Sequence, residues 1–331
     1  MAAISEAISP SLLKQHLRPF DMRRDLSAVA DLVELCFADT LDPDGRDYLR
    51  RMRSAGGRDS DGSTASILRS AQGWASSPMT GYVWVEDGQI VGNVSLIPYF
   101  IQTQRHYLIA NVAVHPKYRR LGIARRMTEQ AVAYVREHRV ASVWLHVREE
   151  NQAALDLYHS LKFIERAVRT TWLTDPDFSS IEKPPGVRFF EPIGESWPMI
   201  RAWLLRTYPP QLSWHMPFHL NTLRPGLIGA FLRFMVNSNI RQWGVLQENR
   251  LAAAAAWQAT GAHANLLWLA APENANPLAV SALLEHIRHH SPTRRAVALD
   301  YPARQLDTAI RSAGFHEQQT LVWMELPIDQ Q

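Results

Sequence analysis

Residues 117–126, Lys-Tyr-Arg-Arg-Leu-Gly-Ile-Ala-Arg-Arg, combine small residues with positive charge, as an anion-binding turn does. Gly122 and Ala124 have no bulky side chain, so phosphate oxygens can approach the main chain there. If a helix begins at this point, its first N–H groups have no intrahelical partner and its dipole favours negative charge. A solvated basic helix face is the alternative interpretation. The glycine turn favours a phosphate site, and positive side chains would surround it: Arg119, Arg120, Arg125 and Arg126.

The elements on either side of this turn can be predicted from hydrophobic patterning. Tyr107–Val114 is apolar and β-branched, which predicts a buried strand. His115-Pro116 ends this strand, because proline has no backbone donor and restrains the residue before it. From Gly122 onwards the apolar residues follow helical spacing. They are Ile123, Met127, Ala131, Tyr134 and Val135.

The pattern Arg119-x-x-Gly122-x-Ala124 resembles the signature of the GNAT superfamily of acyl-CoA-dependent N-acetyltransferases. The Val-Ala-Val-His-Pro strand end before it is also typical of that family, as are several residues between Asn151 and Phe163. The resemblance covers roughly residues 15–175, about one domain. It implies that the turn holds the pyrophosphate of acetyl-CoA and that the preceding strand holds the pantetheine arm. The cofactor-binding residues that it implies are Val112, Ala113, Val114, Arg119, Arg120, Leu121, Gly122, Ile123, Ala124, Arg125, Asn151 and Tyr158.

The resemblance also implies a reaction, in which an amine attacks the thioester carbonyl of acetyl-CoA and the CoA thiolate leaves. Tyr158 would protonate the departing sulfur, and Asn151 would orient the pantetheine arm. Each residue also has a structural interpretation. Asn151 can cap a helix that Glu149–Asn151 begins and that runs to about Leu161, and Tyr158 can pack between helix and sheet.

The general base is left open by the sequence. Asn111 stands where some relatives carry a carboxylate, and an amide cannot accept a proton. A water relay, or an acceptor that arrives deprotonated, are further possibilities. A non-catalytic acyl-CoA-binding sensor or regulatory module is therefore the alternative function. The nearest titratable residues are His106, His146, Glu149 and Glu150.

Composition limits the class of protein. The chain has 331 residues, 46% hydrophobic and 20% charged, with a net charge of +3. Its basic residues are scattered, so we expect neither nucleic-acid nor membrane partners, and the expected partner is a small-molecule or peptide amine. No apolar run approaches the ~20 residues that cross a bilayer, and no signal peptide is apparent. The single cysteine, Cys36, suits a reducing, cytoplasmic location and is predicted to be a packed core thiol.

The first half begins with a predicted strand at Leu17–Phe20 and helices at Asp21–Phe37 and Asp44–Arg53. A hairpin follows, with Asp87-Gly88 as a type I′ turn between strands. A strand at Ala141–Val147 should run parallel to the central strand. The early helical region forms the acceptor pocket in the family. Acceptor contacts are therefore expected from it, although ordinary loop or cap roles are the alternative for each candidate: Phe37, Asp39 and Asp42.

From residue 187 the same order of strands and helices recurs, which indicates a duplication. We therefore expect an α/β protein with an α+β type of mixed sheet. It would consist of two tandem GNAT-like domains, each a mixed central β-sheet flanked by helices. The expected limits are residues 14–175 for the acetyltransferase domain, 176–186 for a linker and 187–328 for a degenerate second domain.

The second copy is expected to have no acetyl-CoA site. Aligning Pro272 with Pro116 places Leu278 opposite Gly122, with Ala275 and Val280 opposite the other signature residues. Aligning Phe315 with Phe163 places Ile310 opposite Tyr158. No metal is expected either. Histidines at helical spacing could hold zinc, but no further ligand stands at a suitable distance, which favours solvated helix faces. These histidines are His215, His219, His286, His289 and His290.

Overall fold

The computed structural model describes residues 16–328 except 57–79, 102, 139, 175–185, 193, 215, 217–219, 236–238 and 294. The chain divides into two compact units. Unit 1 contains the residues up to His146, Gln152–Ile164 and the end of the chain from Met324. Unit 2 contains Val147–Asn151 and Glu165–Trp323.

Unit 1 is built on a mixed sheet in the order β1-β2-β3-β4-β5-β12. Neighbouring strands from β1 to β4 are antiparallel, and β4 runs parallel to β5, as the sequence predicts. The elements along this part of the chain are β1 (Leu17–Pro19), α2 (Met22–Phe37), α3 (Pro43–Gly56), β2 (Thr80–Glu86), β3 (Gln89–Ile101), β4 (Gln104–Val114), the 3-10 turn η1 (Pro116–Tyr118), α5 (Ile123–Arg136), β5 (Ser142–Arg148) and α6 (Gln152–Ser160).

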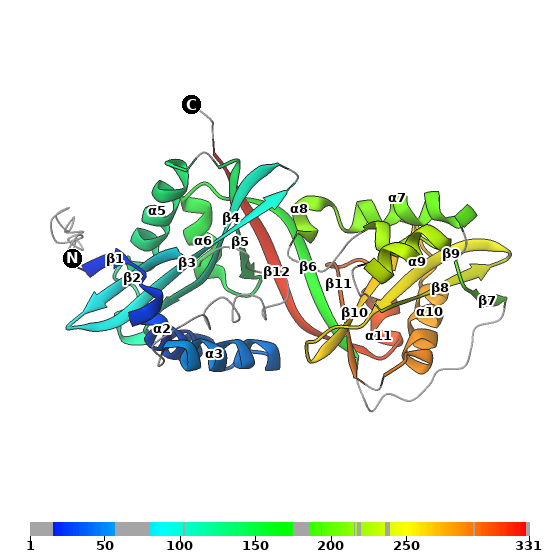
Figure 1. Ribbon diagram of the computed structural model, residues 1–331, viewed down its shortest axis with the longest axis horizontal. Helices are drawn as coiled ribbons and strands as arrows, with labels where there is room; N and C mark the ends of the chain where they lie inside the picture. The colour runs from blue at the N-terminus through cyan, green and yellow to red at the C-terminus, as the bar shows by residue number, and fades with distance from the viewer. Residues whose placement is uncertain are drawn as a thin grey trace, which may run out of the picture. The chain divides into compact units, whose positions relative to one another are not determined.

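The helices of unit 1 cover both faces of its sheet (Figure 1). α5 packs on β2, β3 and β4 from one side, and α2 packs on β3 and β4 from the other, with α3 against α2. Gly92 in β3 permits the close approach of α5. A Cβ atom there would lie 2.9 Å from the Trp84 Cβ and 3.0 Å from the Met127 Sδ. The α5 helix is thus held directly against the central strands, and its first turn lies at the end of β4.

Unit 2 repeats this architecture in the order β12-β6-β11-β10-β9-β8-β7. Its two helical layers lie on opposite faces of the sheet (Figure 1). The elements are β6 (Ile164–Thr174), β7 (Val187–Phe190), η2 (Gly194–Ser196), α7 (Trp197–Thr207), α8 (Pro210–Ser213), η3 (Leu220–Leu223), α9 (Gly226–Met235), β8 (Ile240–Gln247), β9 (Arg250–Gln258), β10 (Ala264–Ala270), α10 (Pro277–His290), β11 (Ala296–Pro302), α11 (Asp307–Ser312) and β12 (Phe315–Pro327).

The duplication extends to turn geometry. The β2–β3 hairpin turns at Asp87-Gly88 with φ of 48° and 77°, and the β8–β9 hairpin turns at Glu248-Asn249 with φ of 49° and 62°. Positive φ at both central residues is the type I′ turn. Each hairpin also has a register irregularity just before its turn. β10 runs parallel to β11 as β4 does to β5. The predicted fold class, two tandem mixed α/β domains, is confirmed.

The last strand of each copy completes the sheet of the other unit. β6, which follows α6 of the first copy, pairs with β11 in unit 2. The end of β12 belongs to unit 1, where the Ile328 N–H donates to the Ala141 oxygen at 3.0 Å. The predicted limits at residues 14–175 and 187–328 describe the duplicated segments and stay a prediction. The predicted linker, 176–186, lies outside the described residues apart from Gly186.

Two helix starts differ from expectation. Glu149, Glu150 and Asn151 form a turn, and α6 begins after them at Gln152. The predicted helix from Gln305 begins at Asp307, because Leu306 adopts a left-handed conformation with φ of 59°. Such a conformation cannot continue a right-handed helix.

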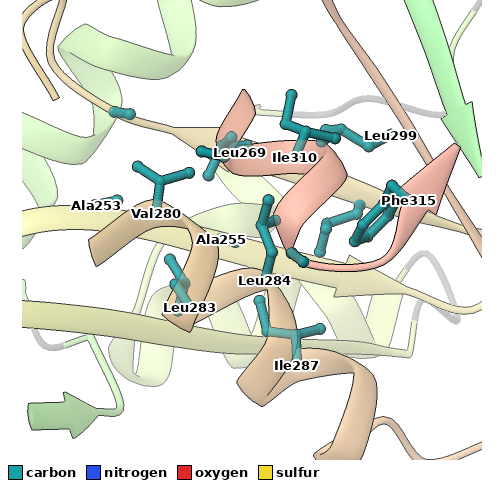
Figure 2. Close-up of a cluster of buried hydrophobic side chains, with 14 of the residues drawn as sticks. Ala253, Ala255, Leu269, Val280, Leu283, Leu284, Ile287, Leu299, Ile310 and Phe315 are labelled. Carbon is teal, nitrogen blue, oxygen red and sulfur yellow. The ribbon is translucent and has the colours of Figure 1, made fainter. Parts of the chain in front are cut away.

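The unit 2 core lies between its sheet and the two helices α10 and α11 (Figure 2). One buried cluster there includes Val280, Leu284 and Ile287 of α10, Ile310 of α11 and Leu269 of β10. Among the described residues, no helix combines the length and the apolar character that crossing a membrane requires.

Candidate active site

The turn before α5 has an open helix N-terminus. Gly122 is the N-cap residue with φ of 78°, and no side chain caps the helix. The first intrahelical bond runs from the Arg126 N–H to the Gly122 oxygen at 3.1 Å. The N–H groups of Ile123, Ala124 and Arg125 therefore have no acceptor within the helix. A Cβ at Gly122 would meet open space, its nearest atom being 4.0 Å away, so the positive φ is what requires glycine here.

The arginines around this turn have different surroundings. Arg119 and Arg120 are exposed on the turn, and the Arg119 Nε donates to the Val114 oxygen at 3.2 Å. The Arg126 guanidinium lies over the Trp84 ring, 6.0 Å from its centroid. Arg125 instead donates to the Ser160 Oγ at 2.6 Å, so its side chain faces α6 and its backbone N–H belongs to the turn. This set of donors suits a pyrophosphate group.

The end of β4 has an unpaired edge next to this turn. β4 pairs with β5 only from His106–Ser142 to Ile109–Leu145, and then continues to Val114 with β3 as its only paired strand. The Val114 oxygen faces that free side, where it accepts from Arg119. Backbone groups on a strand alternate in direction, so Val112 faces the same side. This edge can pair with the amide groups of an extended ligand such as a pantetheine arm.

Tyr158 lies in α6 and is 6% exposed. Its ring meets Phe163 edge-on, with 5.8 Å between the centroids. Burial raises the pKa of Tyr158 well above its usual range, so the phenol stays protonated at neutral pH and can donate a proton. Because the Arg125–Ser160 bond joins α5 to α6, Tyr158 lies on the α5 side of the sheet.

Asn151 directly precedes α6 and is exposed, at the position that a helix cap occupies. It belongs to unit 2, whereas Tyr158 and the α5 turn belong to unit 1. The role of Asn151 toward the pantetheine arm thus stays a prediction.

Of the possible general bases, His146 is the one beside the unpaired edge. It follows Leu145, the last β5 residue paired with β4. Its side chain shares a face with Ser142, four residues earlier, because strand side chains alternate. Tyr107, which pairs with Val143, contacts Tyr134 of α5, so Tyr107 and Val143 face α5. Ser142 and His146 alternate with Val143 and therefore face the α2 side.

The other titratable candidates have different partners. His106 lies at the far end of β4, with its Nδ1 2.8 Å from the Ser142 Oγ, and burial lowers its pKa. Glu149 forms an ion pair with Arg304 in unit 2, and Glu150 is exposed near Arg148.

The expected acceptor residues of the first half have structural roles where the structure defines them. Phe37 packs with the cluster between α2 and α3. The Asp42 Oδ1 accepts from the Gly45 N–H at 2.6 Å at the start of α3, which is the cap role that the sequence left open. Asp39 is exposed.

Cys36 is half-buried at the edge of this cluster, and its location could not be foreseen from sequence. Its Sγ donates to the Val114 oxygen at 3.3 Å, so it shares that acceptor with Arg119. Burial raises the pKa of the thiol, and the nearby Arg119 only partly offsets this effect. The thiol is therefore a packed neighbour of the turn and a weak nucleophile at neutral pH.

In unit 2 the equivalent helix N-terminus is closed by its own residues. α10 begins with Pro277, which has no N–H, and the Asn276 side chain accepts from the Leu278 N–H at 2.9 Å. Asn276 and Gly122 are both N-cap residues, so the structure aligns Asn276 with Gly122. The alignment by Pro272 and Pro116 had placed Leu278 there, which is wrong because the turn before α10 is shorter than the turn before α5. In this first turn the Ala279 N–H alone has no acceptor within the helix or its cap, whereas three N–H groups are open behind Gly122.

The gap between β10 and β11 is filled by a side chain. Their pairing ends at Leu267–Leu299, and the Tyr208 hydroxyl beyond it accepts from the Leu269 N–H at 3.2 Å and donates to the Asp300 oxygen at 3.1 Å. Tyr208 is the C-cap residue of α7. The equivalent helix of the first copy is α2, and its C-cap residue is the small Ala38. In the second copy the place beyond the paired residues is thus occupied by its own tyrosine.

The position of Tyr158 is apolar in the second copy. Lys162 and Gly314 follow α6 and α11 with φ of 70° and 79°, which fixes the alignment of the two helices. Ile310 then corresponds to Tyr158, as predicted, and lies in the buried cluster of unit 2 (Figure 2). Unit 2 has no proton donor at this place.

No metal site is found in the part of the chain that the structure describes, where no group of three metal-binding side chains converges. His286 stacks on Phe189 and on His290, each with 4.0 Å between the ring centroids. His289 lies 3.8 Å from Glu285. His215 and His219 lie outside the described residues.

Comparison with known proteins shows similarities that lie in the first copy. The Acetyltransferase (GNAT) family model matches residues 47–163. Over 67 residues the chain is 39% identical to the ribosomal protein bS18-alanine N-acetyltransferase of Escherichia coli (strain K12), a match that spans 20% of this chain and 45% of that protein. It is 48% identical over 60 residues to the N-alpha-acetyltransferase daf-31 of Caenorhabditis elegans, spanning 18% and 33% of the two chains.

The chain thus spans less than half the length of these relatives. A solved structure, the GCN5-related N-acetyltransferase from Sphaerobacter thermophilus, has the same fold over 95% of this chain and 96% of its own, with a TM-score of 0.56 and 17% identity. Residues 47–163 are thus similar to the acetyltransferase (GNAT) family, and the chain as a whole shares the fold of a GCN5-related N-acetyltransferase.

Proposed function

We propose that the chain is an acetyl-CoA-dependent N-acetyltransferase, in which unit 1 moves the acetyl group to a primary amine by direct attack on the thioester. One observation carries this proposal. The uncapped N-terminus of α5 adjoins the unpaired edge of β4, and the second copy has closed both places with its own side chains. Backbone N–H and C=O groups with a purely structural role would have hydrogen-bond partners within the protein in both copies.

The residues of unit 1 would bind acetyl-CoA along this edge. The pyrophosphate lies against the open N–H groups behind Gly122, with Arg119 and Arg120 beside it. Val112–Val114 pair with the pantetheine arm, and the Val112 N–H polarises the thioester carbonyl. Leu121, 60% exposed on the turn, is free to contact the cofactor.

The reaction then needs one base and one acid. The amine nitrogen forms a bond to the carbonyl carbon, and the carbon–sulfur bond breaks. His146, on the α2 face of the sheet, takes the proton that the amine loses. Tyr158, on the α5 face, gives its proton to the departing sulfur. The acid and the base thus lie on opposite faces of the sheet, so the acceptor enters from the face of α2.

The relatives' names support a choice of acceptor, since one is an alanine N-acetyltransferase and the other an N-alpha-acetyltransferase. Peptides with a free N-terminal alanine are thus the first acceptors to test, with polyamines and free amino acids as the comparison.

Calorimetric titration of acetyl-CoA tests the cofactor site. We expect one site per chain, lost in Gly122→Leu. Gly226→Leu is the matched control, since Gly226 has φ of 82° and open space around it but starts α9 in unit 2. Two sites per chain would mean that the second copy also binds. Absence of binding would rule out the proposed function.

An acyl-CoA-binding sensor is the second candidate, because Asn111 provides no carboxylate on β4. Binding of acetyl-CoA with no transfer to any amine of the panel would favour the sensor. Transfer that Tyr158→Phe strongly reduces, with binding retained, would favour the enzyme.

A further inference from the structure

β4 changes its backbone conformation where it leaves β5. Opposite β3, its register shifts between Asn93 and Ser95, which pair with Ala113 and Ala110. β4 therefore carries one extra residue there, a β-bulge at Asn111–Val112. Asn111 has φ of 51°, a left-handed conformation that asparagine tolerates better than other non-glycine residues. The bulge takes the Asn111 carbonyl out of the regular ladder.

The Asn93 side chain supplies the missing partner. Its Nδ2 donates to the Asn111 oxygen at 2.8 Å and to the Ser95 Oγ at 3.2 Å, and Asn93 is fully buried. A carbonyl oxygen can only accept, so the amide nitrogen must face Asn111 and the orientation of the amide is fixed. The Asn93 Oδ1 is buried and has no hydrogen-bond partner among the described residues.

We infer that Asn93 is a positioning residue for acetyl transfer: by holding the Asn111 carbonyl, it fixes the bulge that turns the backbone of Val112 and Val114 toward the thioester. This inference rests on the proposed function. A buried carbonyl without a donor is unfavourable, so loss of Asn93 would let the bulge shift its register. A small displacement of groups that polarise a reacting carbonyl lowers the rate strongly.

Two substitutions separate the donor from the acceptor of this amide. Asn93→Leu removes both, and Asn93→Asp keeps an acceptor oxygen but loses the donor. Both should lower acetyl transfer to an alanine-starting peptide about tenfold or more, whereas the dissociation constant of CoA, which has no thioester, should stay within about twofold. Ser95→Ala is the matched control, since it removes the other acceptor of Nδ2 and leaves the Asn111 bond in place.

Hydrogen exchange provides a readout that needs no turnover. In the wild type, acetyl-CoA should slow amide exchange at Val112 and Val114, and this protection should disappear in Asn93→Leu. Where burial makes an Asn93 variant unstable, the half-buried Asn111 gives a second test. Asn111→Gly keeps the carbonyl and favours positive φ, so it should behave as wild type. Asn111→Val should behave as Asn93→Leu, because a β-branched residue resists that conformation.

Three results would overturn the inference: Asn93→Asp with a wild-type rate, Asn93→Leu with unchanged rate and protection, or a loss of rate with protection intact. Failure of the proposed function gives a different result. In that case the wild type would bind acetyl-CoA and acetylate no amine, while the exchange comparison would still report whether Asn93 holds the bulge.

Discussion

The Tyr208 hydroxyl donates a hydrogen bond to the Asp300 backbone oxygen at 3.1 Å, and it thereby joins α7 to β11 beyond the last paired residues of β10 and β11. The Tyr208 hydroxyl oxygen also accepts from the Leu269 N–H at 3.2 Å. Arg169, on β6, lies over the Tyr208 ring and forms an ion pair with the Asp300 side chain. The backbone groups that a ligand would meet in the first copy are satisfied inside unit 2.

Tyr208→Phe should therefore lower the stability of the protein without affecting acetyl-CoA. The substitution keeps the ring and leaves the Leu269 N–H and the Asp300 carbonyl buried without their partner, which costs about 2 kcal/mol. Chemical denaturation measures the loss, and calorimetry should give the wild-type affinity for acetyl-CoA. An unchanged denaturation midpoint, or a weaker cofactor, would show that this contact has another role.

The features that sequence predicts correctly here depend on neighbours in the chain. Gly122 before a helix, Asp87-Gly88 between two strands and the 3.6-residue spacing of α5 are local patterns, and the structure has each of them. The alignment of Ile310 with Tyr158 also needs only the order of elements. These patterns are sufficient for the fold class and for one end of the candidate site.

The other features depend on contacts between distant segments. Cys36 shares the Val114 oxygen with Arg119, although Val114 lies 78 residues away. Tyr208 reaches Asp300 across 92 residues. No spacing rule connects such pairs. The bulge at Asn111 could not be predicted from sequence for a similar reason. The residue Asn93 in a strand gives no sign that its side chain will donate to the Asn111 carbonyl on the next strand.

Tyr158→Phe should lower kcat by about 10²–10³-fold and leave acetyl-CoA affinity within about twofold, because it removes only the proton donor. The ring still packs against Phe163. Burial raises the pKa of Tyr158 and keeps the phenol protonated. Loss of the phenol proton should therefore not lower the wild-type rate at alkaline pH, and Tyr158→Phe should not change the alkaline side of the pH profile. Steady-state rates with an alanine-starting peptide and calorimetry with acetyl-CoA provide the two readouts. Equal rates for both proteins would remove Tyr158 from the mechanism.

His146→Gln should lower kcat by about 10²-fold or more, because glutamine keeps hydrogen-bonding capacity but cannot accept a proton. Steady-state rates with an alanine-starting peptide measure this loss. His106→Gln is the control, since His106 lies at the far end of β4 with Ser142. A wild-type rate in His146→Gln would indicate that the base lies elsewhere.

Arg18 holds a buried carboxylate in unit 1. Its two terminal nitrogens lie 2.6 and 2.7 Å from the oxygens of Asp25, which is 1% exposed, and the Asp21 N–H donates to the same group at 2.8 Å. Burial alone would raise the pKa of Asp25, but these donors outweigh it and hold the pKa below its usual value. The unfolded chain thus binds this proton more readily than the folded one. The resulting stability is complete above about pH 4 and is lost as the pH falls through the folded pKa.

Arg18→Met should cost about 2 kcal/mol at pH 7, because the carboxylate stays buried without its partner. The difference from wild type should shrink as the pH falls below about 4, since a protonated Asp25 no longer needs the arginine. Denaturation series at several pH values measure this. Arg24→Met is the control, because Arg24 is 69% exposed and reaches Asp25 only at 3.9 Å. A difference that is constant across pH would exclude the ion pair as its cause.

Lys162→Gly should stabilise the protein. Lys162 follows α6 with φ of 70°, and a left-handed conformation costs a non-glycine residue about 1–2 kcal/mol. Glycine removes this cost but loses more backbone entropy on folding, so the expected net gain is about 0.5–1 kcal/mol. The second copy already has Gly314 at this position with φ of 79°. Lys162→Ala is the matched control: it removes the same charged chain, keeps the Cβ and should give no gain. If alanine stabilised as much as glycine, the effect would come from the lysine side chain and the backbone argument would be wrong.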